Sequence, residues 1–282
     1  MTDPLHRLRT TSPRMPGESC RGPRKVSGHA IEDVGGLWHF GSLRGKKRVL
    51  TRDGWRVPTL FNVLDDHSWL ACHAQWYLAD DPENAVDTLM RAMQKRGLPH
   101  AVMTDNCAPM NASEITRGLA ALKIEHQTML PFCPYQFAKQ ERFASLVERS
   151  LPPMLESVTG LSLELLNDVT STWLESEYNC RPHSTMGTTP IDRFLTAPVM
   201  PRVCPDPLQL KLAFTRADRP RVRKSDGTVS VAGVRFGVPE GYRDRTSIEV
   251  RYARWDLTFV HMIDVEAGAE SCRLMPCSSK RT

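Results

Sequence analysis

The sequence predicts a mixed α/β sheet with helices on its faces, followed by a small all-β domain. Apolar residues first recur with the period of strands, and then with the period of helices that alternate with short strands. A Pro-rich stretch at residues 201–220 precedes further strand-like runs. The chain has 282 residues, 40% of them hydrophobic and 24% charged, so it exceeds one average domain and can bury a core.

Three strand-like runs open the ordered part of the sequence. Residues 48–50 and 57–63 lie on either side of Asp53-Gly54, a hairpin signal, and residues 70–78 follow a turn-like stretch. These runs predict an antiparallel meander.

Helices and short strands are expected to alternate after the meander. The first helix begins at Asp80-Asp81-Pro82, with acids at its positive end, and ends at Gly97. The long helix expected from about residue 138 should kink or break at Pro152-Pro153. The remaining expected elements are a strand at 100–104, a helix at 111–122, a strand at 123–128, a helix from about 138 and a helix at roughly 161–178.

Composition divides the chain into four parts. Residues 1–30 mix Pro, Gly, Ser and Arg without apolar periodicity, which predicts a disordered basic arm. A core at residues 31–200 and a linker at 201–225 follow. Strand-like runs with intervening turns then predict a small β-barrel-like domain at 226–282.

Charge is distributed unevenly around a net +5. Residues 1–30 carry +4 and residues 201–282 carry +5, whereas the 16 basic and 20 acidic residues between them give −4. This pattern suits an enzyme that holds cations at its centre while its ends bind a polyanion. Charge that serves solubility alone is the alternative interpretation.

Several classes of protein are disfavoured. The sequence has no apolar run of the ~20 residues that a membrane span needs, and no apolar region follows the basic N-terminus as in a secretory signal. The eight cysteines form no C-x-x-C pair and no zinc-like spacing, so we interpret them as reduced cytosolic thiols.

Two acidic residues are candidates for chemistry. Asp105 directly follows the predicted strand at 100–104, and Glu141 lies near the start of the long helix, with 35 residues between them. A carboxylate at a strand end can meet one on the first turns of a packed helix, and such a pair can share a divalent cation. Phosphoryl transfer on DNA commonly uses two Mg²⁺ ions. Taken alone, an Asp and a Glu at this spacing are more often solvated surface residues.

Three longer segments make the case specific. KRGLPHAVMTDNCAPM, LPFCPYQFAKQERF and EYNCRPHSTMGTTPIDRFL resemble the integrase catalytic core of bacterial insertion-sequence DDE transposases, which are similar to retroviral integrases. The resemblance covers about residues 35–265 and includes the D-x35-E spacing. It implies an RNase H-like fold for residues 31–200, with three antiparallel strands, two shorter parallel strands and flanking helices.

The same resemblance implies a function. Asp105 and Glu141 would be catalytic, metal-binding residues that hold Mg²⁺ or Mn²⁺ during DNA integration and recombination. The partners would be element ends and target DNA, bound by a homo-oligomer without a membrane. The expected location is the bacterial cytoplasm, at the nucleoid when the protein is bound to DNA.

One departure from the family bears on activity. The family carries a first Asp on its first strand, and with Trp38-His39 in register that position is Gly41. No acid occurs from residue 34 to residue 51, and Asp65-Asp66 are expected to be structural turn residues.

Other departures agree with this one. Cys107 replaces a usual Gly, Phe137-Ala138 replaces Asn-Gly, and no helix-turn-helix region precedes the core. We therefore expect a degenerate or truncated transposase copy, with a catalytically inactive DNA-binding remnant as the alternative.

Five basic residues are expected to contact DNA phosphates. Lys139 and Arg142 flank Glu141, and Arg221, Arg223 and Lys224 form a cluster ahead of the all-β domain. The alternative for both groups is an ordinary solvated surface.

Overall fold

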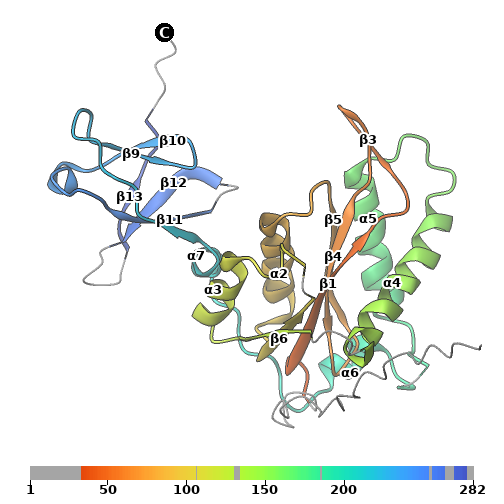
Figure 1. Cartoon of the computed structure of the whole chain (residues 1–282). Coiled ribbons are helices and arrows are strands. Elements are labelled where there is room, and N and C mark those ends of the chain that lie inside the picture. Colours follow the sequence, from red (N-terminus) through yellow and green to blue (C-terminus); the bar gives the residue numbers. More distant parts are fainter. Residues whose placement is uncertain are drawn as a thin grey trace, which may run out of the picture.

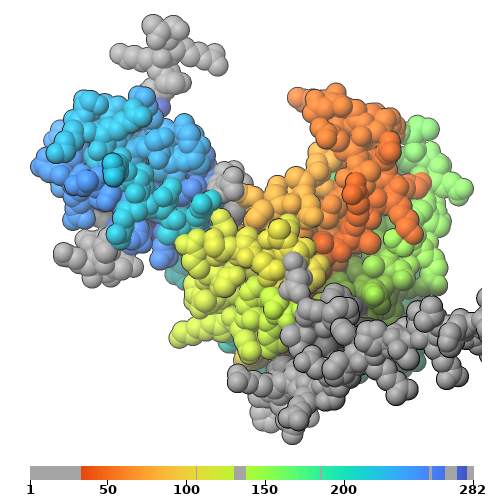
Figure 2. All heavy atoms as spheres, viewed as in Figure 1, coloured from red at the N-terminus to blue at the C-terminus, as the bar shows by residue number. Residues whose placement is uncertain are grey.

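A computed structural model describes residues 33–105, 107–129, 134–184, 186–253, 256–263 and 270–277. The predicted basic arm at residues 1–30 lies outside the described residues. An α/β part is followed by a separate all-β part, and helix α7 lies at their junction (Figure 1). In the space-filling view the outline is concave between the all-β part and the β2–β3 region (Figure 2). No described helix is long and apolar enough to cross a membrane.

The α/β part is built on a five-stranded mixed sheet. Its strands, in the order of the sheet, are β5 (Ala71–Tyr77), β4 (Thr59–Asp65), β1 (Leu37–Arg44), β6 (Ala101–Thr104) and β7 (Glu125–Thr128). β1, β4 and β5 run antiparallel, whereas β6 is parallel to β1 and β7 is parallel to β6. The expected fold is therefore confirmed: three antiparallel strands, then two shorter parallel ones, with the order of an RNase H-like sheet.

The first strand of the meander differs from the pattern-based prediction. Residues 48–50 do not join the sheet, because β2 (Val49–Thr51) and β3 (Gly54–Arg56) form a hairpin of their own. The Leu50 amide donates to the Leu161 carbonyl at 2.7 Å, which holds this hairpin to the loop before α5. The sheet begins instead with β1, whose first five residues are all buried. Burial of both faces removes the alternation that reveals a strand in a sequence.

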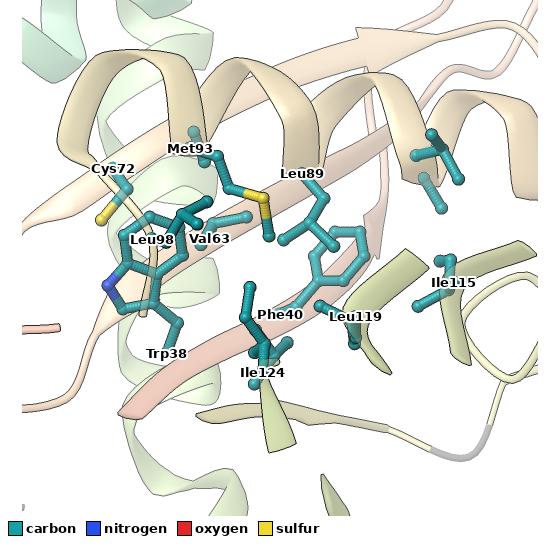
Figure 3. Close-up of a cluster of buried hydrophobic side chains, with 14 of the residues drawn as sticks. Trp38, Phe40, Val63, Cys72, Leu89, Met93, Leu98, Ile115, Leu119 and Ile124 are labelled. Atoms are coloured by element: carbon teal, nitrogen blue, oxygen red, sulfur yellow. The ribbon is translucent and has the colours of Figure 1, made fainter. Parts of the chain in front are cut away.

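Helices cover both faces of the sheet (Figure 1). On one face, α2 and α3 enclose a core with Trp38, Phe40 and Leu89 at its centre (Figure 3). On the other face, α4 and α5 bury Phe143 and Trp173. The helices of this part are α2 (Pro82–Arg96), α3 (Ser113–Ala121), α4 (Pro134–Met154), α5 (Leu163–Trp173), its π-helical extension η1 (Leu174–Tyr178) and α6 (Pro190–Leu195).

The helix ends follow their sequence signals. Asp81 caps α2 by accepting from the Asn84 amide at 2.9 Å, and Gly97 ends the helix with a φ of 87°. Pro152 and Pro153 lie in the last turn of α4, which ends at Met154. These prolines therefore precede the end of the helix rather than divide it.

Residues 207–218, within the predicted linker, form regular structure. α7 (Pro207–Ala213) packs on α3, and its residue Leu210 and its C-cap Phe214 are fully buried in the core of the α/β part. β8 (Arg216–Asp218) pairs with β11. Amphipathic burial of α7 was hidden in the sequence because the surrounding prolines dominate its composition.

Two small sheets enclose the core of the all-β part, which includes Val229, Phe236 and Val260. The expected C-terminal all-β region is thus present. The elements are β9 (Thr228–Val231) paired with β10 (Val234–Gly237), the 3-10 turn η2 (Glu240–Tyr242), and the sheet β13 (Glu270–Leu274), β12 (Asp256–Ile263), β11 (Glu249–Ala253), β8.

Candidate active site

Strand pairing places three positions side by side across the sheet. Gly41 on β1 pairs with Asn62 on β4. Phe40 on β1 pairs in parallel with Thr104 on β6. The next residues along the two segments, Gly41 and Asp105, therefore lie side by side. Side chains of paired residues face the same side of a sheet. Asn62, Gly41 and Asp105 therefore form a row, and the face they share is the one that α4 covers.

The two predicted carboxylates line one cavity above this row. Its volume is about 160 Å³. Asp105 is half-buried at its edge, and Glu141 is exposed on α4. The residues that line the cavity are Gly41, Ser42, Asn62, Asp105, Met129, Gln140, Glu141 and Ala144.

Gln140 occupies the space that a side chain at Gly41 would need. A Cβ at Gly41 would lie 2.7 Å from Gln140 Oε1 and 2.8 Å from its Cδ. Gln140 Nε2 donates to the His39 carbonyl at 3.0 Å, which directs Oε1 over Gly41. A neutral amide thus covers the position of Gly41.

Asp105 interacts closely with Cys107. The Cys107 amide donates to Asp105 Oδ1 at 3.0 Å. Burial, together with the hydrogen bond and negative charge of Asp105, raises the pKa of the Cys107 thiol to about 12. The thiol is therefore protonated at neutral pH and adds no negative charge to the site.

Asp80 is an acidic neighbour that the sequence indicated only as part of a helix start. Burial and the like charges of Asp105 and Asp81 raise the pKa of Asp80 above its ordinary value. Its place before α2 brings it near the carboxyl end of β6, a proximity that sequence spacing does not reveal.

Asn62 is a second residue that sequence reasoning missed. Its side chain is 2% exposed, and its Nδ2 donates to the Gly41 carbonyl at 3.3 Å. Its Oδ1 is buried and has no hydrogen-bond partner among the described residues. A polar residue in a strand whose neighbours Phe61 and Val63 are core residues is the signal that was available.

Asp65, the last residue of β4, and Asp66, which begins the following turn, are structural, as expected. Asp65 accepts hydrogen bonds from the Gly35 amide at 2.6 Å and from the Ser68 amide and hydroxyl at 2.8 and 2.6 Å. Burial outweighs these bonds and raises the pKa of Asp65. Asp65 pairs with Trp38, three residues before Gly41 on β1, so the turn lies away from the cavity.

Lys139 is engaged with the second of these acids. Its Nζ donates to Asp66 Oδ1 at 2.5 Å and to the Asp66 carbonyl at 2.7 Å, and His39 Nε2 also contacts Oδ1 at 2.7 Å. Burial alone would raise the pKa of Asp66, but His39 and Lys139 outweigh it and lower the pKa. Lys139 also lies 5.1 Å from the centre of the Trp69 ring. It ties the start of α4 to the sheet.

The other candidate DNA contacts lie at two further places. Arg142 is exposed, stacks over Trp69 at 5.6 Å, and lines a groove of about 410 Å³ together with Arg149 and Arg181. Arg221, Arg223 and Lys224 are exposed at the start of the all-β part. The structure thus separates the five predicted basic residues into one ion-paired lysine, one groove arginine and a distant cluster.

The donor atoms of the cavity fit one hard divalent cation. Mg²⁺ and Mn²⁺ prefer carboxylate, amide and water oxygens, and the cavity offers two carboxylates with amide oxygens beside them. The cavity does not match a pair of divalent cations, because the two carboxylates carry two negative charges and two such cations carry four positive ones. Among the described residues, no group of three or more His, Cys, Asp or Glu side chains is placed to hold a metal ion.

Comparisons with known proteins give structural likenesses only. No family model and no curated protein sequence matches the chain. The HTLV-2 integrase catalytic core domain in complex with magnesium, in its trimeric form, is similar at a TM-score of 0.45 and 15% identity, over 55% of this chain and 93% of that one. The catalytic core domain of BIV integrase is similar at 0.45 and 18%, over 56% and 93%.

A larger assembly gives a longer match. A chain of the simian T-cell lymphotropic virus intasome, solved in complex with PP2A regulatory subunit B56 gamma, is similar at a TM-score of 0.49 and 14% identity. This match covers 85% of the present chain and 75% of that chain. At these identities and TM-scores, the function of the chain has to be argued from its own residues.

Proposed function

We propose that this chain is the core of a DDE-type transposase or integrase that acts on DNA, in a degenerate form without the first catalytic carboxylate. The observation that carries the proposal is the meeting of Asp105, at the end of β6, and Glu141, on α4, in one cavity above Gly41. This convergence joins two of the three sequence segments that resemble the integrase core of bacterial insertion-sequence transposases, the one with Asp105 and the one with Glu141.

Asp105 and Glu141 are the residues that would hold Mg²⁺ or Mn²⁺. When bound, a divalent cation neutralises the charge that develops on a phosphate undergoing substitution. The chain's own contribution is to fix the two carboxylates. The strand pairing of β6 places Asp105, the Gln140 hydrogen bond holds α4 against β1, and the Lys139 hydrogen bonds hold it against Asp66 at the end of β4. We therefore assign catalytic roles to Asp105 and Glu141.

The absent carboxylate sets the expected level of activity. Two-cation phosphoryl transfer steadies both the attacking and the leaving oxygen, whereas the charge of this site balances one cation only. We expect weak or no turnover from the protein as it stands. A catalytically inactive DNA-binding remnant is the second candidate, favoured by the Gln140 amide that covers Gly41.

DNA is the proposed partner, at element ends and at target sites. Arg142 with its groove, and the cluster Arg221, Arg223 and Lys224, are exposed and can approach phosphates. Lys139 would contact DNA only in exchange for its ion pair with Asp66. We further propose a homo-oligomer on DNA in the bacterial cytoplasm, associated with the nucleoid when it is bound.

Binding and turnover are tested separately on the full chain. We expect a duplex taken from the DNA that flanks the gene to be bound with an affinity that falls as salt rises. Combined Arg221→Ala, Arg223→Ala and Lys224→Ala should reduce the magnitude of the salt slope by up to about 3. Equal slopes for this variant and the wild type would contradict the assignment of the cluster.

Turnover is measured as nicking and joining of the same duplex with Mg²⁺ or Mn²⁺. Nicking by the wild type that disappears in Asp105→Asn and Glu141→Gln supports the transferase. Binding without nicking, in the wild type and in Gly41→Asp alike, supports the inactive remnant. Absence of DNA binding even at low salt would contradict both forms of the proposal.

A further inference from the structure

We infer that Asn62 is a ligand of the cation site, where its side-chain oxygen stands in for the missing carboxylate of the first strand. The inference rests on the proposed function and deepens it, since it names a third protein ligand that no acidic motif indicates.

The position of Asn62 is fixed by the sheet. Its Cα partner on β1 is Gly41, the residue at the expected position of the first carboxylate. One strand spacing, about 4.8 Å, separates neighbouring strands, so that Asn62 and Asp105 lie on opposite sides of Gly41 and face the same cavity. Because Gly41 has no side chain, nothing on β1 lies between them, and the space above Gly41 is covered by the Gln140 amide of α4.

The orientation of the Asn62 amide is set by its own hydrogen bond. Nδ2 donates to the Gly41 carbonyl at 3.3 Å. A flipped amide would place Oδ1 against the Gly41 carbonyl oxygen, and two acceptors repel each other. Nδ2 therefore faces the carbonyl, and Oδ1 is the amide atom that this hydrogen bond does not use. In this orientation Oδ1 is buried and has no partner among the described residues.

A buried oxygen acceptor without a partner calls for an explanation. Asn62 is 2% exposed and lies between the core residues Phe61 and Val63, where an apolar side chain would fit the surroundings of the strand. Side-chain carbonyl oxygens are regular ligands of hard divalent cations, as carboxylates are. A cation held by Asp105 and Glu141 supplies the electropositive partner that Oδ1 lacks.

Charge favours a single cation at such a site. Two carboxylates and a neutral amide balance one divalent ion. This arrangement differs from a site with three carboxylates by one negative charge, so the wild type should bind one cation with moderate affinity. Replacing the amide by a carboxylate at the same position should increase that affinity.

The test is a titration of the full chain with Mn²⁺ in which the free ion is measured by electron paramagnetic resonance. Thermal unfolding with and without Mn²⁺ is the second measurement. For the wild type we expect one bound Mn²⁺. Asn62→Leu, which keeps the branched shape of the side chain, should bind it at least about 10-fold more weakly. Without cation this variant should unfold at the same temperature as the wild type or higher. Asn62→Asp should bind at least about 10-fold more tightly and gain more thermal stability from Mn²⁺.

Asn167→Leu is the matched control. Asn167 also has a branched amide in contact with a strand, but both of its amide atoms are bonded, to the Trp76 amide at 2.7 Å and the Trp76 carbonyl at 3.1 Å. This variant should lose thermal stability and keep its affinity for Mn²⁺. The comparison separates loss of a ligand from loss of structure.

The outcomes distinguish this inference from the proposed function. If Mn²⁺ binding is lost in Asp105→Asn but unchanged in Asn62→Leu, the cation site stands and the role of Asn62 is overturned. If Gln140→Leu weakens binding and Asn62→Leu does not, the third ligand is Gln140 and the inference is again overturned. If the wild type binds no Mn²⁺, both the inference and the metal site of the proposed function fail, whereas DNA binding is judged by its own assay.

Discussion

The substitution Gly41→Asp puts a carboxylate where the family resemblance expects one, and its cost follows from the structure. The new Cβ would meet Gln140 Oε1 at 2.7 Å, so the Gln140 side chain has to rotate and give up its hydrogen bond to the His39 carbonyl. That lost bond costs about 1 kcal/mol. Removing a glycine from a strand offsets about 0.5–1 kcal/mol of this.

Electrostatic repulsion is the larger contribution. A carboxylate about 5 Å from Asp105, at an effective dielectric constant of about 20, is repelled by about 3 kcal/mol. Without a divalent cation, we expect Gly41→Asp to lower the free energy of unfolding by about 3 kcal/mol in total, a fall in Tm of about 6–12 °C for a body of this size. A cation present at about 100 times its Kd restores about 2.7 kcal/mol.

The assay is thermal unfolding with and without saturating Mg²⁺ or Mn²⁺, together with nicking of flanking DNA. We expect the Tm of Gly41→Asp to depend on the cation more strongly than that of the wild type, and nicking to increase. Gly241→Asp is the control, because among the described residues no atom beyond Gly241 and its two chain neighbours lies within 4 Å of a Cβ there. In a Gln140→Ala background there is no side chain to displace, so Gly41→Asp added to Gln140→Ala should show only the electrostatic part of the loss.

One result would refute this reasoning. If Gly41→Asp unfolds at the wild-type temperature and its Tm responds to cation no more than that of Gly241→Asp, position 41 does not adjoin Asp105 and Glu141 as the strand register places it.

Three further predictions concern the body of the protein. Burial and nearby Lys95 lower the pKa of His73 from 6.5 to about 4, so the folded state binds this proton less well than the unfolded chain. The stability from neutral His73 is therefore present above about pH 6.5 and falls by about 3 kcal/mol towards pH 4. In urea unfolding, the free energy of unfolding of His73→Gln should depend less on pH across that window than that of the wild type. A Cβ at Gly118 would lie 2.2 Å from Phe214 Cδ1, so Gly118→Ala should destabilise by about 1–3 kcal/mol in chemical denaturation, and Phe214→Leu in the same chain should relieve part of the loss. Leu89→Ala at the fully buried centre of α2 should cost about 2–5 kcal/mol, and a change below 1 kcal/mol in the same assay would contradict the packing of α2 on the sheet.

Local chemistry allowed much of the architecture to be predicted. Asp81 with Pro82 and the terminal Gly97 mark α2 because capping depends on side chains next to each other in the chain. The strand at residues 101–104 and the following Asp105 could also be predicted, because a short apolar run and the residue after it are adjacent in the chain. By contrast, β1 escaped the pattern analysis because both of its faces are buried, and the strand-like run at residues 48–50 was assigned to the sheet although it forms a separate hairpin.

The sequence by itself determined the kind of protein to expect: the order of strands and helices, the Asp105–Glu141 pair, and the absence of an acid at Gly41. Only the tertiary structure decided what fills that gap, because Gln140 and Asn62 lie far from Gly41 along the chain and reach it through helix packing and strand register. It also decided that Lys139 is paired with Asp66 and that Asp80 lies near Asp105. Contacts of this kind arise from folding across long sequence separations, which local propensity and motif spacing do not encode.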